Sequence, residues 1–212
     1  TRRGEVTPSW DTHGCLTFPR DGGFRAEAGG VLLGQPPADA EINVLKSWDG
    51  GNSARGQDSA EFAHLAALKW ETTCELGAVA SSPAELDTAI RANPKIDVTA
   101  MLLAEARWFE PGLLGLCLFH RTWAGNVFLD FLAAHPKAEG QIGGLGAGLL
   151  YHLCEVSCRL RAPLLWGETA AGSTEFYERA FGIENVRDQL LVSLEQQRAY
   201  CRRMEGKWGG DD

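Results

Sequence analysis

The chain has 212 residues, 44% of them hydrophobic and 23% charged, which suits one α/β domain or a smaller domain with an extension. Its formal net charge of −8 argues against a nucleic-acid partner, because binding to phosphates needs a concentrated basic face. No apolar run approaches the roughly eighteen residues of a membrane helix, and the polar residues after Arg3 do not predict a signal peptide. We therefore expect a cytoplasmic protein without a membrane partner.

Residues 1–57 are rich in Gly, Pro and Asp and predict an N-terminal extension, either separate from or part of the domain formed by residues 58–212. Short apolar runs such as Val31-Leu32-Leu33 are candidates for one or two short strands. Residues 48–57 predict a flexible loop, since glycine, serine and asparagine dominate them.

Two helices are predicted next. Residues 59–76 carry apolar side chains at helical spacing, with Asp58 or Ser59 as the cap and Gly77 after the last turn. Residues 82–93 begin with Ser-Pro-Ala-Glu, in which the serine caps, the proline occupies the first turn and the glutamate completes a capping box.

Three strands follow over residues 97–108, 113–123 and 127–134, separated by short turns that contain glycine. Strands joined in this way predict an antiparallel meander. Beyond a glycine-rich loop, the pattern predicts a helix over 145–161, a strand over 163–169, and helices over 173–181 and 185–205.

The segment Gln141-Ile-Gly-Gly-Leu-Gly146 lies between the last strand of the meander and the next predicted helix. Its glycines let the backbone approach a ligand closely, because no Cβ intervenes. The N–H groups and the dipole of the following helix can then bind a pyrophosphate without any lysine.

Two other phosphate loops fit these residues less well. A Walker loop ends in Gly-Lys-Ser/Thr, and this loop has neither a lysine nor a hydroxyl residue. A dinucleotide fingerprint needs a third glycine where Leu149 stands, although Glu168 lies at the distance expected for a ribose contact. Because the meander argues against a doubly wound sheet, a nucleotide-dependent oxidoreductase is the weaker alternative.

The pattern Gln141-x-x-Gly144-x-Gly146 resembles the Q/R-x-x-G-x-G/A signature of the GNAT superfamily of N-acyltransferases. Residues 173–182, which include Phe-Tyr-Glu, resemble the FYE-type helix of that family, and the likeness covers roughly residues 97–183. It implies an α/β (α+β) fold with a GNAT-like mixed central sheet, an antiparallel meander, helices on both faces and, here, an extra C-terminal helix.

The resemblance also implies acetyl-CoA or another acyl-CoA as co-substrate, no metal, and a small-molecule amine or peptide as acceptor. In the family, two parallel strands splay apart and the pantetheine arm inserts between them. The implied contacts for the co-substrate are Leu132, Ala133, Ala134, Gln141, Ile142, Gly143, Gly144, Leu145, Gly146, Ala147, Ser173 and Phe176.

Tyr177 matches the tyrosine that often acts as general acid toward the CoA sulfur, although a packed aromatic residue is the alternative. Asp130 and Glu105 are candidates for the general base, and a salt-bridged or solvated carboxylate is the alternative for each. His120 and His135 are further candidates for proton transfer, or else ordinary residues at strand ends.

The family normally closes with two more strands, where residues 185–205 here predict a helix. This departure favours an alternative function, a catalytically inactive module that binds CoA or partner proteins, and the helix offers an apolar face to a second subunit. The six cysteines form no CxxC pair. Cys154, Cys158 and His152 fall on one predicted helix, where they are expected to be core residues, with metal ligation as the alternative.

Overall fold

The computed structural model describes residues 29–32, 37–80, 83–106, 109–110, 112–138 and 142–209. Its strands are β1 (Gly29–Leu32), β2 (Val98–Ala106), β3 (Leu113–Arg121), β4 (Val127–Ala134), β5 (Leu164–Glu168) and β6 (Gln189–Ser193). Its helices are α1 (Asp39–Lys46), α2 (Ala54–Glu75), α3 (Pro83–Ala92), α4 (Leu145–Arg159), α5 (Thr174–Phe181) and α6 (Leu194–Gly209), with short 3-10 turns at Pro136–Ala138 and Ala171–Ser173. Within these ranges, no helix is long and apolar enough to cross a lipid bilayer.

The described strands form one six-stranded sheet in the order β1-β2-β3-β4-β5-β6. Neighbouring strands are antiparallel except for β4 and β5, which are parallel. The predicted meander of β2, β3 and β4 is confirmed, as is the mixed α+β sheet. Because this sheet is not doubly wound, the alternative of a Rossmann-type oxidoreductase loses its structural basis.

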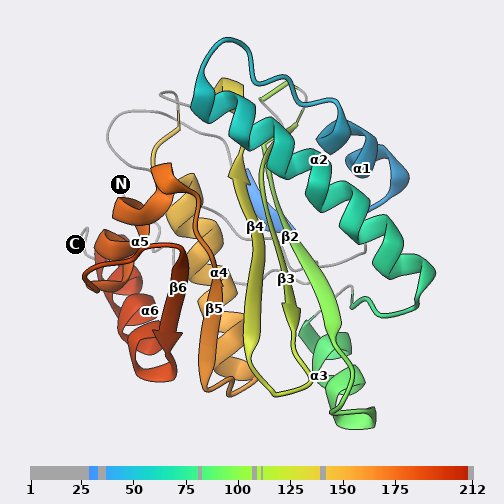
Figure 1. The fold of residues 1–212 in the computed structure, drawn as a ribbon, viewed down its shortest axis with the longest axis vertical. Coiled ribbons are helices and arrows are strands. Elements are labelled where there is room, and N and C mark those ends of the chain that lie inside the picture. Colours follow the sequence, from blue (N-terminus) through green and yellow to red (C-terminus); the bar gives the residue numbers. More distant parts are fainter. Residues whose placement is uncertain are drawn as a thin grey trace, which may run out of the picture.

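The parallel pair β4–β5 is short. Its last pair joins Leu129 to Gly167, after which β4 continues to Ala134 while β5 ends at Glu168. Figure 1 shows β5 leading away into α5, while β4 continues beside β3. Beyond Leu129, this edge of β4 has no strand partner in the described part of the chain, so its N–H and C=O groups can pair with an extended ligand.

A β-bulge interrupts β4 where the parallel pairing ends. Phe119 pairs with Leu129 and Leu118 with Phe131, which leaves Asp130 as the extra residue. Asp130 and Phe131 therefore both contact side chains of α2, although successive residues of a regular strand point to opposite faces.

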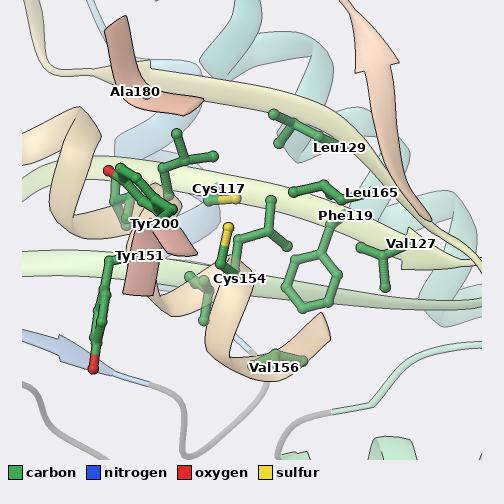
Figure 2. Close-up of a cluster of buried hydrophobic side chains, with 14 of the residues drawn as sticks. Cys117, Phe119, Val127, Leu129, Tyr151, Cys154, Val156, Leu165, Ala180 and Tyr200 are labelled. Atoms are coloured by element: carbon green, nitrogen blue, oxygen red, sulfur yellow. The ribbon is translucent and has the colours of Figure 1, made fainter. Parts of the chain in front are cut away.

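Two hydrophobic clusters cover the two faces of the sheet. Helices α1 and α2 pack against one face, and α4, with α5 and α6 beside it, packs against the other (Figure 1). Figure 2 shows Cys117 and Phe119 of β3 in the second cluster, together with Cys154 of α4 and Tyr200 of α6. The Tyr200 hydroxyl also donates a hydrogen bond to the carbonyl oxygen of Ala147 (2.8 Å), so α6 is tied to the first turn of α4.

The described part of residues 1–57 is more regular than its composition predicts. Strand β1 extends the sheet beside β2, and α1, which was not predicted, buries Leu45 completely. The expected boundary after residue 57 falls inside α2. These residues therefore belong to the same sheet and core as the rest of the chain.

The prediction of a flexible loop over residues 48–57 is wrong at its C-terminal end. Helix α2 begins at Ala54, and its cap is Ser53 rather than Asp58 or Ser59, because the Ser53 side chain accepts a hydrogen bond from the N–H of Gly56 (3.0 Å). Gly56 packs so closely that a Cβ there would lie 2.3 Å from the Gly50 carbonyl oxygen. The glycines thus permit a tight helix entry.

The prediction of one helix over residues 185–205 is also wrong in its first half. Residues 189–193 form β6, in which Leu190 and Val192 are buried while Leu191 is 53% exposed. The expected extra C-terminal helix is confirmed, but it begins only at Leu194. The helical spacing of Val186, Leu190 and Leu194 concealed the alternating pattern of the strand.

Candidate functional site

The predicted glycine loop leads directly into α4. Gly144 has a left-handed backbone (φ 80°) and precedes the first residue of the helix. A Cβ added at Gly143 or Gly144 would meet no atom within 4 Å, so this turn borders open space. The N–H groups at the start of α4 and its dipole favour an anion in that space.

A cavity of about 230 Å³ lies beside this turn. Its lining comes from the end of β4, from the turn itself and from the first turns of α2: Arg55, Ser59, Ala134, His135, Pro136, Ala138, Ile142, Gly144, Leu145 and Gly146. The cavity therefore adjoins the unpaired edge of β4. Among the implied contacts for the co-substrate, Ala134, Ile142, Gly144, Leu145 and Gly146 are brought together here.

Arg55 and Ser59 are functional candidates that the sequence analysis missed. Their surroundings in the sequence predict a loop for Arg55 and a helix cap for Ser59, yet α2 places both on the cavity wall. A guanidinium group recognises phosphate oxygens through several N–H donors. The turn itself contains no lysine, so Arg55 brings the positive charge that the loop lacks.

His135 closes the wall of the cavity next to Ala134. Its ring is buried between Trp48 and Phe109, with ring centroids 4.8 and 5.1 Å away, and its Nδ1 accepts a hydrogen bond from the N–H of Lys137 (3.1 Å). Burial, together with the nearby Lys137 charge, lowers the pKa of His135. The imidazole is therefore neutral at pH 7 and acts here as packing.

Tyr177 lies on α5, in the cluster on the α4 face, and is 5% exposed. Burial, and secondarily Cys117, raises the pKa of its phenol well above the ordinary value. Its hydroxyl group makes no recorded hydrogen bond to a described residue. The phenol thus keeps its proton at neutral pH, as a general acid must.

The neighbours of Tyr177 on α5 support the glycine turn. The ring of Phe176 lies 5.0 Å from that of Tyr177, and a Cβ on Gly146 would contact it at 3.6 Å. Phe176 therefore packs on the first turn of α4. Ser173, by contrast, donates its hydroxyl proton to the carbonyl oxygen of Ala170 (2.8 Å), within its own turn.

Asp130 lies at the bulge where β4 leaves β5, and its side chain is 5% exposed. One carboxylate oxygen is 2.5 Å from Lys69 Nζ on α2, and the other is 2.8 Å from His120 Nδ1 on β3. Of the two roles considered for this carboxylate, the structure fits the salt-bridged one. Both oxygens are occupied, which makes Asp130 a poor base.

Glu105 does not join this group. It lies near the end of β2, pairs across the bulged register with Leu113, and is separated from β4 by β3. Burial, together with Glu41 of α1, raises its pKa. Its charged neighbour is thus on α1, and the structure does not bring it to Asp130 or Tyr177.

Gln141 falls outside the described residues, so its predicted role stays a prediction. On α4, Cys154 is fully buried and His152 Nδ1 is 2.8 Å from Glu155, which fits the packing alternative for this helix. The described residues contain no group of three or more His, Cys, Asp or Glu side chains suited to a metal ion.

No protein-family model and no curated protein matches this sequence. Among solved structures, the fold is similar to that of a Desulfovibrio desulfuricans protein assigned to the GNAT family of acetyltransferases, with a TM-score of 0.50 and 19% identity over 79% of this chain and 99% of that one. The acetyl-CoA complex of AtaTR matches with a TM-score of 0.41 and 14% identity over 73% of this chain and 88% of that one.

Nourseothricin acetyltransferase matches with a TM-score of 0.34 and 20% identity over 38% of this chain, which spans only 48% of that enzyme. The fold assignment rests on the Desulfovibrio structure, because the other two superpose too loosely to support an argument. The similarity to that structure and the mixed sheet show that this chain has the fold of the GNAT acetyltransferases.

Proposed function

We propose that this protein is an acyl-CoA-dependent N-acyltransferase that transfers an acyl group, in the first instance acetyl, to an amine by direct attack. The acceptor is a small-molecule amine or a peptide amine. One observation carries the proposal: the free edge of β4 beyond Leu129 leads into a cavity lined by the glycine turn of α4 and by Arg55.

The residues around this cavity fit a CoA thioester. The backbone of Leu132, Ala133 and Ala134 offers N–H and C=O groups to the pantetheine amides, as an added strand would use them. At the mouth, the turn before α4 offers main-chain N–H groups and Arg55 a positive charge to the diphosphate. The open space beside Gly143 and Gly144 leaves room for that group.

The bound thioester supplies an activated acyl carbon. The amine nitrogen forms a bond to that carbon and gives up one proton to a base, the carbon–sulfur bond breaks, and the departing thiolate takes a proton. Tyr177 is the proposed donor of that proton, since its phenol is neutral and its hydroxyl has no recorded partner among the described residues. No covalent intermediate on the protein is required.

Binding is tested by thermal unfolding with acetyl-CoA, CoA and NAD, because a ligand specific for the folded state raises Tm. Acetyl-CoA and CoA should stabilise the protein and NAD should not. Arg55→Ala should weaken the stabilisation, while Arg91→Ala on α3, whose side chain pairs with Asp87, should leave it unchanged. Stabilisation by NAD alone would refute the proposal.

Turnover is tested by release of free thiol from acetyl-CoA with an alkyl diamine, an arylethylamine, an aminoglycoside and a peptide with a free N-terminus. A specific observation favours the alternative of a non-catalytic CoA-binding module: a helix, α6, follows β6 where the family normally has a further strand. Stabilisation by acetyl-CoA without thiol release from any of these amines would support that alternative.

A further inference from the structure

Three charged or titratable side chains from three elements meet beside the bulge of β4. Asp130 holds Lys69 of α2 at 2.5 Å and His120 of β3 at 2.8 Å. The exposed fractions of their side chains rise from 5% for Asp130 to 18% for His120 and 38% for Lys69. The carboxylate is thus buried, whereas the imidazole and the lysine are partly exposed.

Strand alternation and register explain why these residues meet. His120 pairs across the sheet with Phe128 and therefore points to the same face as Phe128. Asp130 lies two residues beyond Phe128 and so points to this face as well, and α2 crosses the same face with Lys69.

The hydrogen bond to Asp130 orients the imidazole. Its Nδ1 faces a carboxylate oxygen, which can only accept a hydrogen bond, so in the neutral ring Nδ1 carries the proton and the lone pair lies on Nε2. Nε2 makes no hydrogen bond to a described residue, and it is not fully buried. It is therefore open to solvent or substrate.

This lone pair lies close to the end of the parallel pairing. His120 is opposite Phe128, one residue before the last β4–β5 pair at Leu129, and a step of two residues along a strand is only about 7 Å. Tyr177 belongs to the core cluster on the opposite face of the sheet. The proposed proton acceptor and the proposed proton donor thus lie on opposite faces of the sheet.

We infer that His120 is the general base of the acyl transfer, that Asp130 is its positioning residue, and that Lys69 balances the charge of the carboxylate. This inference rests on the proposed function. As the amine nitrogen bonds to the acyl carbon, its proton passes to His120 Nε2, directly or through one water molecule. The sulfur leaves with the bonding electrons and is protonated from the Tyr177 side.

The other candidate bases are placed less well. Both oxygens of Asp130 are already occupied, and Glu105 lies beside Glu41 beyond β3. His135 uses its Nδ1 for the N–H of Lys137 and is packed between aromatic rings at the far end of β4. His120 alone among these four combines a carboxylate partner with an open ring nitrogen.

The first test reads the tautomer of His120 by nitrogen-15 NMR of the full chain, with assignment from His120→Gln. The neutral ring should carry its proton on Nδ1, and this preference should relax in Asp130→Asn. The charged groups recorded at this ring are Asp130 from β4 and, through it, Lys69 from α2; its partner on β2, Thr99, carries no charge. A neutral ring protonated on Nε2 would overturn the inference without any measurement of activity.

The second test measures thiol release from acetyl-CoA against pH, with the best amine of the panel or, if none reacts, with water as acceptor. His120→Gln should lower kcat by about 100-fold or more and remove the acidic limb of the profile, while the acetyl-CoA-induced Tm shift persists. Added imidazole should partly restore His120→Ala.

His64→Gln is the matched control, because His64 is exposed on α2 and has no part in the cluster. A His120→Gln variant that keeps the wild-type rate and pH profile would overturn the inference and leave the proposed function standing. Failure of acetyl-CoA to stabilise even the wild-type protein would instead remove the proposed function. The two failures are therefore distinguishable.

Discussion

The entry into α2 makes a sharp prediction, because two helical glycines should respond in opposite ways to the same added methyl group. At Gly56 a Cβ would lie 2.3 Å from the Gly50 carbonyl oxygen and 2.7 Å from Ser53 Oγ. Ordinary contacts begin near 3.5 Å, so the backbone of the entry must move by about 1 Å. At Gly206 of α6 a Cβ would meet nothing within 4 Å.

The expected magnitudes follow from the contacts that each change disturbs. In Gly56→Ala, overpacking costs about 1–3 kcal/mol, and disturbance of the Ser53 cap costs about 1 kcal/mol more. The better helix propensity of alanine returns about 1 kcal/mol, so the free energy of unfolding should fall by about 2 kcal/mol. In Gly206→Ala only the gain remains, and stability should rise by about 0.5–1 kcal/mol.

Urea denaturation followed by circular dichroism measures both changes. Titration with acetyl-CoA supplies a second measurement, because a displaced helix entry carries Arg55 and Ser59 away from the cavity. Gly56→Ala should therefore also weaken binding, and Gly206→Ala should not. If Gly56→Ala proves as stable as wild type, α2 does not begin with the tight packing described here.

Three further predictions concern the site. Gly144→Ala should lose about 1–2 kcal/mol of stability, because the backbone at Gly144 is left-handed. Gly143→Ala should keep its stability, because Gly143 has the same open space and no left-handed backbone. Urea denaturation of both variants measures the difference. Burial lowers the pKa values of His135 and His152 below 6.5, so the unfolded state takes up protons before the folded state does. The free energy of unfolding should therefore fall as the pH drops below about 6.5, by at most about 1.4 kcal/mol per pH unit for each histidine. If His135→Asn and His152→Gln leave the slope of stability against pH unchanged, this account is contradicted. Tyr177→Phe should lower the rate of thiol release by about 100-fold with an unchanged acetyl-CoA-induced Tm shift, and full activity would exclude it as the acid.

The centre of the fold could be predicted from local sequence. Strand β4 has the bounds that were expected, because turn residues flank its apolar run, and the bounds of β2, β3, β5 and α4 differ by a few residues at most. In these elements the spacing of apolar residues along the sequence has the period of the structure that they form. In β6, a run of Leu-Leu-Val also fitted the helical spacing of its flanks, so pairing with β5 decided the outcome.

The glycine turn and Tyr177 were accessible from sequence because each lies within a short motif. Arg55 was not, since glycine-rich surroundings predicted a loop and concealed the helix that places it at the cavity. The contact of His120 with Asp130 was equally inaccessible, because it depends on the register of β3 against β4. Register is set by the packing of whole strands, which single-residue patterns do not report.

The bulge of β4 at Asp130 also decides which face of the sheet each later residue of this strand points to. Because Asp130 is one extra residue, every later side chain points to the face opposite to the one that regular alternation would give it. Leu132 and Ala134 therefore lie with the α4 cluster, and Ala133 lies with the α2 cluster. Deletion of Asp130 would therefore do more than remove a carboxylate. It would either exchange the two sides for the rest of the strand or shift its exit, and with it the turn that leads into α4.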